Sequence, residues 1–252
     1  DDLRDDLAWP TDDLGELVVK LAFEILLFLD QLGIAVGHFL VGAGIFESNG
    51  DLHLRADTLG NAAGTIQHAG MGTLAIDART LDGAGGAIES NGALALTGDT
   101  TDLRGGTTTA QRISIDTGRL TTAGGRLTAT GTDALALTVR EAPDNGAGTI
   151  QGNGAVLLNA GALDNAQGTI TAAGDAASHI AVDGALDNQD GTIAAGGAAT
   201  VTAGDVDNRG GTLQAMDALQ LTVEGQLDNS GQGQIASGDD MTLVAETLDN
   251  TT

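Results

Sequence analysis

The sequence contains no cysteine and almost no proline, and each shortage excludes a class of protein. Without cysteine, the chain of 252 residues forms neither disulfides nor thiolate metal sites. Two prolines beside 39 glycines exclude collagen and proline-rich linkers. The stability of the chain must therefore come from backbone pairing and a continuous apolar core.

Aromatic residues and positive charge are also scarce. The aromatic side chains all lie within the first 46 residues: Trp9, Phe23, Phe28, Phe39 and Phe46. Beyond residue 46, their absence argues against glycan binding by ring stacking. Ten Lys and Arg residues against 35 Asp and Glu give a net charge of −25. A chain this acidic is repelled by phosphate backbones and anionic lipid, so we expect no nucleic-acid partner.

An eight-residue phrase, by contrast, is abundant. Residues 163–170 read LDNAQGTI, and the close copies are 59–66 (LGNAAGTI), 143–150 (PDNGAGTI), 186–193 (LDNQDGTI), 206–213 (VDNRGGTL) and 227–235 (LDNSGQGQI). Weaker copies are 81–88 (LDGAGGAI), 103–110 (LRGGTTTA) and 120–127 (LTTAGGRL). Their first residues lie 17 to 23 positions apart, mostly 20 to 23. A period of this length indicates a stacked-repeat architecture.

Each repeat also carries a short run of alternating apolar residues, such as Leu135, Leu137 and Val139. Alternation with a period of two indicates a half-buried strand. Two short strands and tight turns in about 21 residues fit one turn of a parallel β-helix, whereas the Gly, Thr, Asn and Asp content opposes helix. We predict about ten turns from residues 47–252, stacked about 4.8 Å apart.

Residues 1–46 do not repeat. Thr11 is a suitable N-cap for an amphipathic helix over 12–32, and residues 34–46 suit a strand, a loop or a second helix. Lys20, Glu24 and Asp30 interrupt the apolar stretch, leaving less than the ~20 residues needed to cross a membrane. The acidic start is unlike a signal peptide. We predict that 1–46 caps one end of the stack; sequence foreign to the fold and membrane contact are the alternatives.

Stacking predicts columns of like residues, one member in each turn. The aliphatic residues that begin and end the phrase should point inward. An asparagine column should hydrogen-bond between turns and accept a left-handed conformation: Asn61, Asn145, Asn165, Asn188, Asn208, Asn229 and Asn250. A β-branched column is predicted at Thr65, Thr149, Thr169, Thr192 and Thr212. The glycine that follows should supply a positive φ or a missing Cβ. The short spacing between Leu103 and Leu120 predicts a distorted turn or a loop excursion there.

An aspartate column is the most suggestive polar feature: Asp82, Asp144, Asp164, Asp187, Asp207, Asp228 and Asp249. Carboxylates about 5 Å apart repel by about 1 kcal/mol per pair in water, and a divalent cation would relieve this. The alternative is that each caps backbone amides in an Asx turn. The nonapeptide of calcium-binding β-rolls is absent, so no metal site is predicted.

No pattern predicts catalysis. A glycosidase-like site needs one acid–base pair in a cleft, whereas the acids here recur in every turn. Basic residues are concentrated at Arg104, Arg112, Arg119, Arg126 and Arg140. They form either a patch beside a groove or scattered side chains that neutralise surface acids. The histidines share no metal-ligand spacing: His38, His53, His68 and His179. We expect no catalytic residue, no cofactor and no enzyme activity.

The phrase LDNxxGTI, its return after about 21 residues and the alternating second strand resemble the repeats of filamentous haemagglutinin-like exoproteins. This family comprises bacterial two-partner-secretion adhesins and contact-dependent growth-inhibition toxins, and the resemblance covers residues 47–252. It implies an all-β fold, a right-handed parallel β-helix. It also implies secretion to the bacterial cell surface through an outer-membrane transporter, and service as a shaft for adhesive or toxic modules.

Neither the family's N-terminal secretion domain nor a C-terminal toxin is recognisable, and no catalytic residue carries over. We therefore expect a fragment or a short member, with a receptor on a host or neighbouring cell that the sequence does not identify. Two other hypotheses of function stay open: a carbohydrate-active β-helix enzyme, and a calcium-stabilised passenger like those of autotransporters.

Overall fold

The computed structural model describes residues 36–40 and 45–251. All of them belong to the second of the two compact units into which the chain divides, Ala35–Thr252. Every regular element among the described residues is a β-strand, which confirms the all-β prediction. The helix predicted over 12–32 lies outside the described residues, and so does most of the predicted cap.

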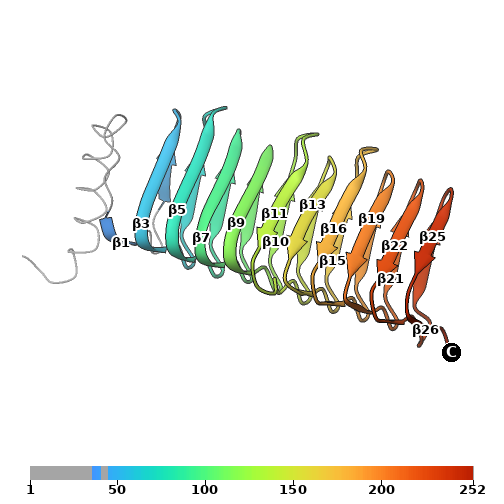
Figure 1. Ribbon diagram of the computed structural model, residues 1–252. Coiled ribbons are helices and arrows are strands. Elements are labelled where there is room, and N and C mark those ends of the chain that lie inside the picture. The colour runs from blue at the N-terminus through green and yellow to red at the C-terminus, as the bar shows by residue number, and fades with distance from the viewer. Residues whose placement is uncertain (1–35, 41–44, 252) are drawn as a thin grey trace, which may run out of the picture. The chain divides into compact units, whose positions relative to one another are not determined.

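The strands form three sheets in which successive turns of the chain lie side by side (Figure 1). Sheet A has 11 strands. In order they are β1 (Val36–Leu40), β3 (Leu52–Gly60), β5 (Thr73–Asp82), β7 (Ala93–Asp102), β9 (Arg112–Thr121), β11 (Leu135–Val139), β13 (Val156–Ala160), β16 (Ser178–Val182), β19 (Ala199–Ala203), β22 (Leu219–Val223) and β25 (Met241–Val244).

Sheet B has 10 strands, one in each turn, which agrees with the prediction of about ten turns. In order they are β2 (Ile45–Ser48), β4 (Thr65–His68), β6 (Ala87–Ser90), β8 (Thr107–Ala110), β10 (Arg126–Ala129), β12 (Thr149–Gly152), β15 (Thr169–Ala172), β18 (Thr192–Ala195), β21 (Thr212–Ala215) and β24 (Gln234–Ser237). Each strand after β2 contains the end of one copy of the phrase.

Sheet C has five short strands that begin the phrase, and the sequence did not predict it as a separate sheet. They are β14 (Leu163–Asp164), β17 (Ala185–Asp187), β20 (Asp205–Asp207), β23 (Gln226–Asp228) and β26 (Thr247–Asp249). In the N-terminal turns the long strands β3 to β9 of sheet A run on without a break into this third side. Each turn therefore has three sides where two strands were expected.

All pairing between turns is parallel and in register, which makes the fold a parallel β-solenoid. In sheet B, Thr149 pairs with Thr169, Thr169 with Thr192, and Thr192 with Thr212. Identical side chains therefore lie above one another. The pairing starts before the predicted boundary at residue 47, since β1 pairs with β3 and β2 with β4.

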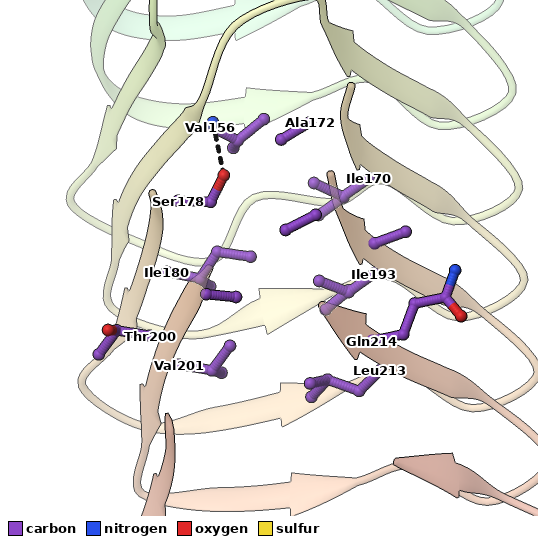
Figure 2. A pocket seen from close by; sticks show the side chains of 13 residues that line it. Val156, Ile170, Ala172, Ser178, Ile180, Ile193, Thr200, Val201, Leu213 and Gln214 are labelled. Carbon is purple, nitrogen blue, oxygen red and sulfur yellow. Dashed lines mark hydrogen bonds between the residues drawn. The ribbon is translucent and has the colours of Figure 1, made fainter. Parts of the chain in front are cut away.

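The alternating residues form the core, because every second side chain of a strand faces the interior. In sheet B the inward Ile150, Ile170 and Ile193 are at most 4% exposed. In sheet A the inward Leu158, Ile180 and Val201 are at most 3% exposed. A cavity of about 10 Å³ remains between the two sheets, beside Ile170, Ile180 and Val201, with room for about one water molecule (Figure 2). No substrate enters an interior packed this closely.

The turn near Leu103 is regular, so the predicted distortion there is wrong. Leu81 pairs with Thr101, and Thr101 pairs with Leu120, which makes the two spacings 20 and 19 residues. The repeat therefore begins at Thr101, two residues before the apolar letter that resembled its start. Leu103 occupies the position of the asparagine column and is 4% exposed.

Candidate functional site

The asparagine column forms a continuous hydrogen-bonded ladder over the C-terminal turns. In each step the Nδ2 of one asparagine donates to the Oδ1 of the next, over 2.6–2.7 Å, from Asn145 through Asn165, Asn188, Asn208 and Asn229 to Asn250. The first four of these side chains are fully buried. A buried amide needs partners on both sides, and the stacked turns supply them.

The ladder is interrupted between Asn61 and Asn145. Gly83, Leu103 and Thr122 take the asparagine position in the three intervening turns, as the register shows. Thr122 donates from its hydroxyl to the Oδ1 of Asn145 over 2.8 Å, which completes that end of the ladder. Asn61 donates instead to the backbone oxygen of Ala87, and its Oδ1 has no hydrogen-bond partner among the described residues.

The left-handed conformation lies elsewhere in the turn than predicted. Positive φ falls two positions after the asparagine, at Ala63, Ala147, Gln167, Asp190 and Gly210. The repeated glycine one position later has no room for a side chain. A Cβ on Gly191 would overlap the backbone oxygen of Asn165 in the preceding turn. Of the two roles expected for this glycine, the missing Cβ is the one that the geometry requires.

The predicted threonines lie at the first position of their sheet B strands and are half-buried on the outer face. Thr149, Thr169, Thr192 and Thr212 are consecutive members of this column. Thr65 is separated from them by Ala87, Thr107 and Arg126. The column is a strand surface, and it encloses no pocket.

Each carboxylate of the aspartate column caps its own turn. The Oδ1 accepts the backbone N–H two residues later at Asp82, Asp144, Asp164, Asp187, Asp207, Asp228 and Asp249, over 2.9–3.3 Å. Asp102 was not predicted for this column, because the turn begins at Thr101 and not at Leu103, and it makes the same bond over 3.0 Å. This is the Asx-turn geometry that was the alternative to calcium binding. Each carboxylate binds within its own turn, so these aspartates do not form a shared set of oxygen ligands between turns.

The hydrogen bond from the side chain of Arg209 holds the pKa of Asp207 below its ordinary value, in spite of partial burial. At the end of the column, the backbone N–H of Thr251 lowers the pKa of Asp249. Both carboxylates are therefore kept in the charged form that their turns require.

The five arginines of the middle turns do not gather around a groove. Four form ion pairs of 2.6–2.9 Å with separate acids: Arg104 with Asp102, Arg112 with Asp133, Arg119 with Glu141, and Arg140 with Asp116. Arg126 lies in β10, whereas Arg104 lies in a turn, so these two arginines do not share a column. Most of these pairs join neighbouring turns, as surface neutralisers would.

The histidines stay apart. His68 is buried and hydrogen-bonds to the hydroxyl of Ser90 over 2.8 Å and to the backbone oxygen of Gly50. His53 and His179 are exposed on sheet A, and the side chain of His38 lies outside the described part of the chain. Within the residues that the structure describes, no three His, Asp or Glu side chains come close enough to hold a metal ion.

The ordered columns, the tightly packed interior and the paired surface charges define a structural solenoid. The haemagglutinin-repeat family model matches residues 30–75, 69–132, 134–190, 180–231 and 231–252. The chain belongs to the haemagglutinin-repeat family, which confirms the resemblance. Comparison with curated proteins gave no match, and neither did comparison with solved structures. No helix in the described residues is long and apolar enough to span a membrane.

Proposed function

We propose that the chain is a shaft segment of a secreted, surface-displayed bacterial adhesin or contact-dependent inhibition toxin. Its role is to hold binding or toxic modules, located elsewhere, away from the cell. An outer-membrane transporter of the two-partner type exports it. The observation that carries this proposal is the unbroken parallel register from β1 to β25 together with the haemagglutinin repeats.

A shaft needs length and stiffness without chemistry, and the repeat supports both. Each turn bonds to its neighbours through backbone pairing, and the asparagine ladder adds a side-chain hydrogen bond at each step of the C-terminal turns. In such a solenoid each turn contacts only its neighbours, so length increases without any change in the repeat. The acidic surface keeps the shaft soluble.

The two rival functions receive less support. A polysaccharide-cleaving enzyme needs one carboxyl pair in a cleft, whereas the middle acids here are engaged with separate arginines. A calcium-stabilised passenger needs several oxygens around one ion, whereas each aspartate of the column binds its own backbone.

Surface display is tested on intact cells of the producing bacterium. Antibodies raised against residues 47–252 should label them, and added protease should remove the label. Deleting the gene for the outer-membrane transporter should abolish labelling while the protein remains inside the cell. Labelling that persists without any such transporter, or that requires cell lysis, contradicts the proposal.

A further inference from the structure

The outer face of sheet B is uncharged over most of its length. Each strand presents its first and third residues outward. In β15, β18 and β21, towards the C-terminal end, these are Thr169, Thr171, Thr192, Ala194, Thr212 and Gln214, all half-buried. From β4 to β24, Glu89 and Arg126 are the only charged residues at these positions. The other side chains at these positions are threonine, alanine and glutamine, so the face carries hydroxyl, methyl and amide groups.

Most charged residues lie at the corners, on sheet C and on the N-terminal half of sheet A. Residues 149–236 include ten acids and a single base, Arg209, and none of these lies in a strand of sheet A or sheet B. Sheet C carries an aspartate in each of its strands. The outer face of sheet A is neutral in its C-terminal half, but its N-terminal half carries Arg55, Asp77 and Asp116. Sheet B is therefore the one side that is nearly charge-free along the described rod.

We propose that the outer face of sheet B is a docking surface for a second copy of this chain. Two molecules of net charge −25 repel each other wherever their acidic sides meet. Face-to-face contact through sheet B keeps the acids of sheet C and of the corners away from the partner. The facing threonine and glutamine side chains also carry donors and acceptors that can pair across the contact. This goes beyond the shaft role, because it joins shafts to each other.

The available area limits the size of this contact. A strand of four residues is about 13 Å long and neighbouring strands lie about 4.8 Å apart, so each turn contributes about 60 Å² to this face. Nine strands, from β4 to β24, offer about 560 Å² per copy and about 1,100 Å² per pair. Stable interfaces bury about 1,200–2,000 Å² in total. We therefore expect weak association that depends on concentration and strengthens with every additional turn.

The test is sedimentation equilibrium of the 252-residue chain over a wide concentration range, at low and at high salt. The parent should form dimers, and salt should increase the dimer fraction because it screens the repulsion between the acidic sides. The double variant Thr169→Glu/Thr212→Glu adds charge on alternate strands of sheet B and should raise the dimer Kd about tenfold or more.

The matched control is Thr200→Glu/Thr242→Glu, which adds the same charge on alternate strands of sheet A. Figure 2 shows Thr200 and Gln214 pointing away from the interior on opposite sides. The control should change the Kd by less than about threefold, since those residues face away from the contact. A parent that stays monomeric at its solubility limit overturns the proposal, and so does an equal or larger loss in the control.

A second measurement covers the case in which the glutamate variant does not fold, as shown by far-UV circular dichroism. Because the chain has no cysteine, Thr192→Cys and Thr200→Cys each place a single thiol, on sheet B and on sheet A. A short bismaleimide should cross-link the sheet B variant into dimers at least about five times faster, as expected if the contact raises the local thiol concentration. Equal rates, or a faster sheet A variant, overturn the proposal.

Discussion

Asn165 donates a hydrogen bond from its Nδ2 to the Oδ1 of Asn188, the residue at the same position one turn later, over 2.7 Å. Both side chains are fully buried. The bond joins two turns through side chains alone, in addition to the backbone pairing of the three sheets. Because each asparagine is donor to one neighbour and acceptor from the other, removing one member affects two steps of the ladder.

Asn188→Ala should lower the free energy of unfolding by about 2–4 kcal/mol, because it leaves the Oδ1 of Asn208 buried without its donor and removes the acceptor of Asn165. Denaturant unfolding followed by circular dichroism measures the loss. Asn153→Ala is the control. Asn153 also donates to a neighbouring turn, to the backbone oxygen of Thr130, but it is exposed and should cost less than about 1 kcal/mol. Equal losses would mean that burial of the ladder contributes nothing.

Gly85 and Gly86 are adjacent but should respond oppositely to a side chain. A Cβ on Gly86 would overlap the backbone oxygen of Asn61, so Gly86→Ala should destabilise the fold by about 3 kcal/mol. Gly85 has a φ of +65° and open space around its Cβ position. Gly85→Asn should cost less than about 1 kcal/mol, because asparagine tolerates this conformation. The corresponding position in other turns already holds Ala63 and Gln167. Thermal unfolding compares the two, and a larger loss for Gly85→Asn contradicts this account of the turn.

Calcium should not stabilise the chain. The Oδ1 of each aspartate in the column is already held by a backbone N–H, as at Asp164 and Asp187. A ligand raises the melting temperature only if it binds the folded state, so millimolar calcium or a chelator should shift Tm by less than about 1 °C. Differential scanning calorimetry makes the measurement, with magnesium as the control ion. A rise in Tm with calcium that a chelator reverses would support the hypothesis of a calcium-stabilised passenger.

Acid should weaken the turn that contains Asp207 and Arg209. The pKa of Asp207 is lower in the folded chain than in the unfolded one, because Arg209 hydrogen-bonds to the carboxylate. Its contribution to the free energy of unfolding is therefore complete above the unfolded pKa of about 4 and is lost as pH falls through the lower, folded pKa. Arg209→Met should reduce the loss of stability measured between neutral pH and pH 3.

Arg112→Met is the matched control for this titration. Arg112 forms an ion pair of 2.7 Å with Asp133, whose side chain is 61% exposed, against 29% for Asp207. Solvent screening weakens an exposed pair, so this variant should keep more of the parent's acid dependence. NMR titration of the Asp207 carboxyl follows the group directly. A Cγ shift that titrates identically in the parent and in Arg209→Met would contradict the assigned cause.

The distorted turn was predicted wrongly because an apolar residue two positions after the true start resembles that start. Leu103 looked like the apolar start of a copy, yet Thr101 holds that place and Leu103 fills the asparagine position. A two-residue slip cannot be seen in sequence, because an even shift keeps the same face inward. The glycine pair at 105–106 indicates the register more reliably, since the close approach of the preceding turn requires the second glycine.

The sequence alone determined the kind of fold and the kind of surface. Its period, its alternation, its lack of cysteine and its scarcity of aromatic residues leave stacked strands as the means of burying apolar area, and its acids make the surface negative. Tertiary structure decided which residues meet. The third sheet, the break in the asparagine ladder, the position of the left-handed residue and the neutral face of sheet B depend on register between turns about twenty residues apart. No local propensity encodes that register, because it is set by the packing of one turn against the next.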